Sequence, residues 1–86
     1  MHTLVFSRRA QRAFLDLPQS DALRVKERLE KLQENPRMAG TVKLEDVQVA
    51  SYRHRVGNYR ILFDIDDENR RLEILDIRRR SERTYR

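Results

Sequence analysis

The dipeptide Gly57-Asn58 constrains the fold of this chain more than any other feature. Gly-Asn between two stretches of alternating residues is typical of a two-residue β-hairpin turn, and it predicts strands over about residues 51–56 and 59–65. A turn of two residues also fixes the register of the two strands. Arg55 is therefore expected to lie directly opposite Arg60.

The two faces of this hairpin differ in chemistry, because side chains alternate between faces along a strand. One face is expected to reach a core and carries Tyr52, His54, Val56, Tyr59, Ile61 and Phe63. The other face carries Arg53, Arg55 and Arg60, and like charges directly opposite each other destabilise a sheet. We therefore expect an anionic ligand at these arginines. The alternative is a solvated face on which they pair with Asp64 or other nearby acidic residues.

Length and composition limit the remaining possibilities. The 86 residues are expected to form a single domain over 1–86, with a net charge of +5 that favours a polyanionic partner. There is no cysteine, and the two histidines, His2 and His54, form no cluster at metal-ligand spacing, so we expect neither a metal nor another cofactor. No segment is apolar enough to span a membrane, and we expect a cytoplasmic protein without membrane contact.

The first third of the chain predicts a strand and two helices. A short strand at 3–6 leads to Ser7, which is well placed to cap a helix that Pro18 stops. Ser20 or Asp21 is expected to cap a second helix, which ends at Asn35-Pro36. The apolar residues that form the buried stripes of the two helices are Ala10, Ala13, Phe14, Leu17, Ala22, Val25, Leu29 and Leu32.

The remainder of the chain supplies the sheet. Residues 37–49 read as irregular or weakly extended, and a polar turn at 66–69 follows the hairpin. A strand from about 71 to 77 is apolar on both faces, so we place it centrally, between the hairpin and a parallel first strand. The predicted fold is α+β, in the order β-α-α-β-β-β. A two-helix hairpin packs on one face of a four-stranded, mostly antiparallel sheet, and a short basic tail follows.

That tail is strongly basic. Residues 78–86 carry a net charge of +4, with Tyr85 at the penultimate position. Leaving a central strand, the tail should pass the hairpin arginines. The candidate RNA-binding residues are Arg78, Arg79, Arg83 and Arg86. The alternative for the tail is nonspecific attraction to phosphate.

The segment Tyr52-Arg53-His54-Arg55-Val56-Gly57-Asn58-Tyr59-Arg60, its continuation through Ile65, and the end in Tyr85-Arg86 resemble the RelE/ParE toxin superfamily, and within it the RelE-like mRNA interferases. The resemblance covers nearly the whole chain. It implies a toxin of a type II toxin-antitoxin system that enters the A site of the 30S ribosomal subunit, cleaves mRNA there and so inhibits translation. It also implies a cognate RelB-like antitoxin, with a toxin-antitoxin hetero-oligomer.

The resemblance carries site residues over by position. Arg53 and Arg55 match the basic pair of the first hairpin strand, and Arg60 the arginine that stabilises charge at the scissile phosphate. Arg80 matches the arginine after the last strand, and Tyr85 the C-terminal aromatic that stacks on a base or transfers a proton. Many relatives carry Gly-His-Arg where this chain has three arginines, so Arg79 is an alternative to Arg80.

Chemistry supports part of this assignment. Guanidinium groups bind phosphate in a bidentate manner and stabilise a phosphorane, but their pKa is too high for them to act as a base. His54 has a suitable pKa and lies on the wrong face, which leaves no ordinary general base. Two other functions share these features: a ParE-like inhibitor of DNA gyrase and a noncatalytic RNA-binding module.

Overall fold

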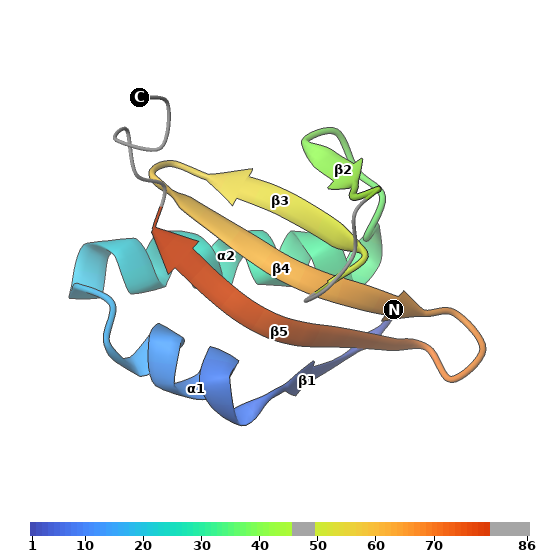
Figure 1. Cartoon of the computed structure of the whole chain (residues 1–86), viewed down its shortest axis with the longest axis horizontal. Coiled ribbons are helices and arrows are strands. Elements are labelled where there is room, and N and C mark those ends of the chain that lie inside the picture. The colour runs from blue at the N-terminus through green and yellow to red at the C-terminus, as the bar shows by residue number, and fades with distance from the viewer. Residues whose placement is uncertain (46–49, 80–86) are drawn as a thin grey trace.

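The computed structural model describes residues 1–45 and 50–79. It contains β1 (Thr3–Phe6), α1 (Arg8–Leu15), α2 (Gln19–Glu34), β2 (Thr41–Lys43), β3 (Tyr52–Val56), β4 (Tyr59–Asp66) and β5 (Arg71–Arg79). The strands form one sheet in the order β1-β5-β4-β3-β2, in which β5 pairs parallel with β1 and antiparallel with β4. The predicted α+β fold, the central position of the last strand and its parallel neighbour are confirmed (Figure 1).

The hairpin has the register that its turn predicts. Val56 pairs with Tyr59 and Arg55 with Arg60. Gly57 has a φ of +57°, whereas Asn58 is not among the residues with positive φ, and this combination is typical of a type II′ turn. The twist of such a turn matches the twist of the strands, so the two residues close the hairpin without strain.

Ser7 caps α1 as predicted, because its side-chain oxygen accepts a hydrogen bond from the backbone N–H of Ala10 at 3.0 Å. The predicted cap of the second helix is wrong. The helix begins at Gln19 with Pro18 as N-cap and has no side-chain cap, so Ser20 and Asp21 lie within its first turn. The Pro18 carbonyl accepts the first helical bond, from Ala22 at 2.8 Å, and a proline has no N–H to leave unpaired there.

The sheet has one strand more than predicted. Residues 41–43, within the stretch expected to be irregular or weakly extended, form β2 at the edge of the sheet, antiparallel to β3. Three residues are too few for alternation to be recognised in a sequence. β5 also runs further than expected and includes Arg78 and Arg79.

The core lies between the helices and one face of the sheet. α1 contributes Ala10 and α2 contributes three aliphatic residues, and these meet the inward-facing residues of β3, β4 and β5. The buried core residues are Ala10, Val25, Leu29, Leu32, Val56, Ile61, Phe63, Leu72, Ile74 and Ile77. Tyr52 and Tyr59 pack against this cluster, so the expectation that the hairpin aromatics belong to the core is confirmed.

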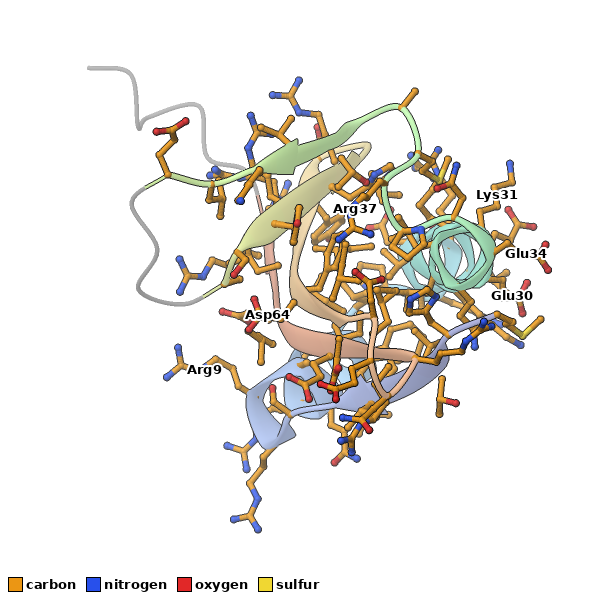
Figure 2. The ribbon with its side chains drawn as sticks, turned by 90° about the vertical axis from the view of Figure 1, so that its right-hand side faces the viewer. Arg9, Glu30, Lys31, Glu34, Arg37 and Asp64 are labelled. Carbon is orange, nitrogen blue, oxygen red and sulfur yellow. The ribbon has the colours of Figure 1, made fainter. Side chains whose placement is uncertain are left out.

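Among the described residues, no helix covers the opposite face of the sheet. Figure 2 shows α2 on one side of the sheet and Asp64 on the other. Within residues 1–45 and 50–79, no helix is long and apolar enough to cross a membrane. Of the predicted functional residues that the structure describes, Arg53, Arg55, Arg60 and Arg78 have the parity of the face away from the helices.

Candidate functional site

Three arginines form a row across three neighbouring strands. Arg55 of β3 pairs with Arg60 of β4, and Arg60 pairs with Arg78 of β5. By the alternation of side chains along their strands, all three belong to the face away from the helices. We call them the arginine row. Like charges directly opposite each other destabilise a sheet, so the arginine row lowers the stability of the fold unless an anion binds to it.

A β-bulge determines which tail arginine joins this row. Leu62 pairs with Asp76 but Phe63 pairs with Ile74, so Leu75 is an extra residue in β5. With strict alternation from Ile74, Asp76 and Arg78 would point into the core. The extra residue reverses the alternation and turns both side chains to the outer face, as bulges near functional sites commonly do.

Ser7 supports the bulge from the other end of the chain. Its hydroxyl donates a hydrogen bond to the Leu75 carbonyl at 2.9 Å, and its backbone N–H donates to the Ile74 carbonyl at 2.9 Å. The same hydroxyl accepts the capping bond from Ala10. One serine therefore joins the start of α1 to the irregular position of the central strand.

A second row lies beside the arginine row and contains Arg53, Leu62 and Asp76. Asp76 is only 6% exposed, and its two carboxylate oxygens accept hydrogen bonds from the Ile77 N–H and from Arg78 Nε, both at 2.8 Å. Arg78 is thus the member of the arginine row that has a carboxylate partner.

The other hairpin arginines have no such partner in the described part of the chain. None of the ion pairs there involves Arg53, Arg55 or Arg60. No ion pair among the described residues joins them to Asp64, so that alternative is wrong there; Asp64 Oδ1 instead accepts a hydrogen bond from the Ser51 N–H at 2.7 Å. Arg60 Nε is also buried without a hydrogen-bond partner among the described residues.

His54 lies on the helix side, as parity predicts, and is fully buried. Arg28 Nη1 lies 2.8 Å from Nε2, and Thr41 Oγ1 lies 2.9 Å from Nδ1. Since a guanidinium can only donate, Nε2 must be the acceptor and Nδ1 must carry the proton. Burial, and then the charge of Arg28, lower the pKa of His54 to about 4. His54 is therefore a structural residue of the core, unable to serve the arginine row.

Arg79 occupies the face opposite to Arg78. It pairs with Tyr59, whose hydroxyl donates to Asp21 Oδ2 at 3.1 Å on the helix side. Burial, and then the hydrogen bond to the Asp21 carboxylate, raise the pKa of Tyr59. Only one of the two described tail arginines therefore meets the hairpin arginines. The remaining candidates, Arg80, Arg83, Tyr85 and Arg86, lie outside the described residues.

Within residues 1–45 and 50–79, no group of three or more His, Asp or Glu side chains could hold a metal ion. What this face offers is guanidinium groups on a rigid sheet, an arrangement suited to binding phosphate.

The sequence and the fold can be compared with those of known proteins. A family model described as the ParE toxin of type II toxin-antitoxin systems matches residues 4–84. The chain belongs to this family, within the RelE/ParE toxin superfamily. No curated protein matches the sequence.

Solved structures of RelE-type toxins share the fold of this ParE-family toxin. The toxin of a RelBE toxin-antitoxin complex from Mycobacterium tuberculosis is 29% identical, with a TM-score of 0.80 over 92% of this chain and 98% of that one. The archaeal RelE-RelB complex from Pyrococcus horikoshii gives 22% identity and a TM-score of 0.80, over 94% and 97% of the two chains. The E. coli RelBE complex gives 22% identity and a TM-score of 0.78, over 95% of this chain and 99% of that one.

Two residues that shape the site could not be recognised in the sequence. Asp76 is one of two acidic residues, with Glu73, in a largely apolar strand, and the sequence identifies Ser7 only as a helix cap. Their relation to Arg78 depends on the bulge at Leu75, for which the sequence of β5 has no glycine or other marker.

Proposed function

We propose that this toxin is a ribosome-dependent endoribonuclease that cleaves mRNA in the ribosomal A site and so inhibits translation. The observation that carries the proposal is the arginine row, in which Arg55, Arg60 and Arg78 are held on three adjacent strands. A row of guanidinium groups on rigid strands suits a phosphodiester whose negative charge increases during reaction.

In the proposed reaction the 2′-hydroxyl of one nucleotide attacks the neighbouring phosphorus. A 2′-oxygen to phosphorus bond forms, the bond to the 5′-oxygen breaks, and the products are a 2′,3′-cyclic phosphate and a 5′-hydroxyl. Arg60, at the centre of the row, stabilises the phosphorane. Arg55 and Arg53 bind and polarise the phosphate from β3, and Arg78 binds it from β5.

The proton transfers need other groups, because arginine stays protonated. We assign them to Tyr85, whose ionised hydroxyl would accept the proton of the 2′-hydroxyl and return it to the leaving 5′-oxygen. Arg80 would assist through its positive charge, without transferring a proton. The ribosome then supplies the orientation of the mRNA, and correct orientation alone can lower a barrier by several kcal/mol, up to about 10. Arg79, Arg83 and Arg86 are proposed to contact RNA phosphates in a metal-independent reaction.

We also propose an antitoxin partner of the RelB type. The toxin from M. tuberculosis was solved in a toxin-antitoxin complex, as were the archaeal and E. coli relatives. An acidic segment that folds on binding would neutralise Arg53, Arg55 and Arg60 and block access of mRNA. Such a segment would form a toxin-antitoxin hetero-oligomer.

Programmed ribosomes test the proposed activity. Purified toxin is mixed with 70S ribosomes carrying a defined A-site codon, in buffer that keeps Mg²⁺ but is stripped of transition metals, and cleavage is mapped by primer extension. We expect a cut within the A-site codon, no cut in free mRNA, and no effect of removing transition metals. An intact A-site codon would refute the proposal.

Inhibition of DNA gyrase is the second candidate, favoured by the ParE description of the matching family. It predicts loss of supercoiling activity in a purified gyrase assay, and inhibition that survives substitution of the arginine row. A noncatalytic RNA-binding module would instead bind RNA in a salt-sensitive manner without cleaving it. Parallel ribosome and gyrase assays on one preparation separate the three functions.

A further inference from the structure

We propose that Asp76 is a positioning residue that orients the guanidinium of Arg78 for contact with the substrate phosphate. The inference rests on the proposed function and adds a residue to the site. A carboxylate next to a phosphate site would ordinarily weaken phosphate binding by repulsion. Its presence in this place therefore needs a reason other than charge.

The geometry gives that reason. Asp76 Oδ1 is held by the Ile77 N–H, and Oδ2 accepts from Arg78 Nε, both at 2.8 Å. The side chain of Asp76 is 9% exposed and that of Arg78 is 48% exposed. A buried, doubly bonded carboxylate is a rigid anchor, whereas the half-exposed arginine would otherwise sample many rotamers.

The choice of nitrogen matters for the chemistry. Because Asp76 engages Nε, both terminal Nη groups of Arg78 stay available for the two oxygens of a phosphate. In the ladder, Asp76 lies opposite Leu62, which is two residues from Arg60, and Arg78 lies opposite Arg60 itself. By orienting Arg78, Asp76 thus fixes the position of the Arg78 guanidinium relative to Arg60 at the centre of the row.

The bulge makes this arrangement possible. The extra residue Leu75 turns Asp76 and Arg78 together to the outer face, so the anchor and the arginine have the same parity. Ser7, which directly follows β1, donates to the bulge carbonyl at 2.9 Å, and β4 pairs with Asp76 and Arg78 on the other side of β5. The anchor therefore sits on a central strand of the sheet, where sites can be held more accurately than on loops.

One substitution separates an electrostatic role of Asp76 from a positioning role, because the two roles predict opposite effects on the interaction with RNA. Asp76→Asn removes a negative charge, so simple electrostatics predicts tighter binding of RNA. Asparagine offers one acceptor oxygen to two donors, so positioning predicts that Arg78 loses its fixed orientation. Glu73→Gln is the matched control, because Glu73 has the outer-face parity of the same strand, opposite Asp64, and removal of its charge leaves Arg78 untouched.

The test compares wild type, Asp76→Asn, Arg78→Gln, the double variant and Glu73→Gln in two assays. The first is single-turnover cleavage at saturating programmed ribosomes. The second is binding of a 2′-O-methyl oligoribonucleotide, which has phosphates but no attacking hydroxyl. Urea unfolding identifies conditions under which every variant is folded.

We expect Asp76→Asn to slow the single-turnover rate by about 10-fold to 100-fold, the cost of a misplaced contact. The double variant should be no slower than Arg78→Gln alone, since Asp76 acts through Arg78. Glu73→Gln should keep the wild-type rate. Oligonucleotide binding by Asp76→Asn should not become tighter, although its net charge is higher.

Three outcomes would overturn the inference: a wild-type rate in folded Asp76→Asn, additive losses in the double variant, or an equal loss in Glu73→Gln. If the wild type binds the oligonucleotide but cleaves nothing, the proposed function fails and the binding comparison alone decides about Asp76. Tighter binding by both Asp76→Asn and Glu73→Gln would then show that Asp76 affects RNA binding only through its negative charge, and would overturn the positioning role. A wild type that neither cleaves nor binds overturns both proposals.

Discussion

The hydroxyl of Ser7 donates a hydrogen bond to the carbonyl oxygen of Leu75, 68 positions later in the chain, at 2.9 Å. The hydroxyl oxygen of Ser7 also accepts the capping hydrogen bond of α1, from the Ala10 N–H. One side chain thus serves both the beginning of a helix and the bulge that turns Asp76 and Arg78 outward. The N-terminal end of the chain is in this way coupled to the candidate site.

Ser7→Ala should lower the free energy of unfolding by about 1 to 2 kcal/mol, because it removes a helix cap and a hydrogen bond to a part-buried carbonyl. Ser7→Thr retains the hydroxyl and should lose less than half of that amount. Urea unfolding followed by circular dichroism measures both. Equal stability of Ser7→Ala and wild type would show that the two hydrogen bonds contribute nothing to the folded state.

The stability of the protein should fall as the pH is lowered from about 6.5 to about 4, because of His54. Burial and the charge of Arg28 lower the pKa of His54 from 6.5 to about 4, so in this range the unfolded chain binds a proton that the folded protein does not. The contribution is complete above pH 6.5 and is lost toward pH 4, by up to about 3 kcal/mol.

Urea unfolding at several pH values checks this, with His54→Gln as the comparison. The variant should be less stable at pH 7, because Arg28 and Thr41 lose their partner. It should also show a smaller slope between pH 6.5 and 4. Parallel slopes in the two proteins would contradict the assignment to His54.

Gly40→Ala should destabilise the protein by about 1 to 3 kcal/mol, for two reasons. Gly40 has a φ of +100°, which residues with a Cβ rarely adopt. A Cβ there would also lie 3.0 Å from Cε1 of the buried His54 ring. The exposed neighbour offers the control, and Ala39→Ser should change the thermal midpoint little. A Gly40→Ala protein as stable as wild type would mean that β2 and its preceding turn shift freely.

Arg60→Ala should leave the fold intact and reduce cleavage by about 100-fold to 1000-fold, the cost of losing one donor to a developing negative charge. Arg60→Lys should recover only part of the activity, since an ammonium group cannot bind two phosphate oxygens as a planar fork does. Removal of a charge that faces Arg55 and Arg78 should not lower stability.

Single-turnover cleavage and growth arrest on induced expression measure the effect of Arg60→Ala. Arg70→Gln, an exposed arginine in the turn between β4 and β5, provides the charge-matched control and should remain toxic. Full toxicity of Arg60→Ala would refute the proposed transition-state role.

Local sequence signals specified much of the fold. Gly57-Asn58 set the hairpin register, because a two-residue turn allows one pairing, and the buried stripe of α2 was visible in its helical spacing. Two errors arose where the local signal was weak. β2 has three residues, and the beginning of α2 depends on Pro18 although better capping residues follow it.

By itself the sequence determined that Arg53, Arg55 and Arg60 share one face and that His54 lies on the other, since alternation in a hairpin of fixed register leaves no choice. It could not determine whether Arg78 or Arg79 joins them. That depends on the extra residue at Leu75, which the packing of Ile74 and Ile77 into the core and the hydrogen bond from Ser7 select together. The physical reason is that a shift of one residue reverses a strand's faces, and only contacts from distant parts of the chain fix where that shift occurs.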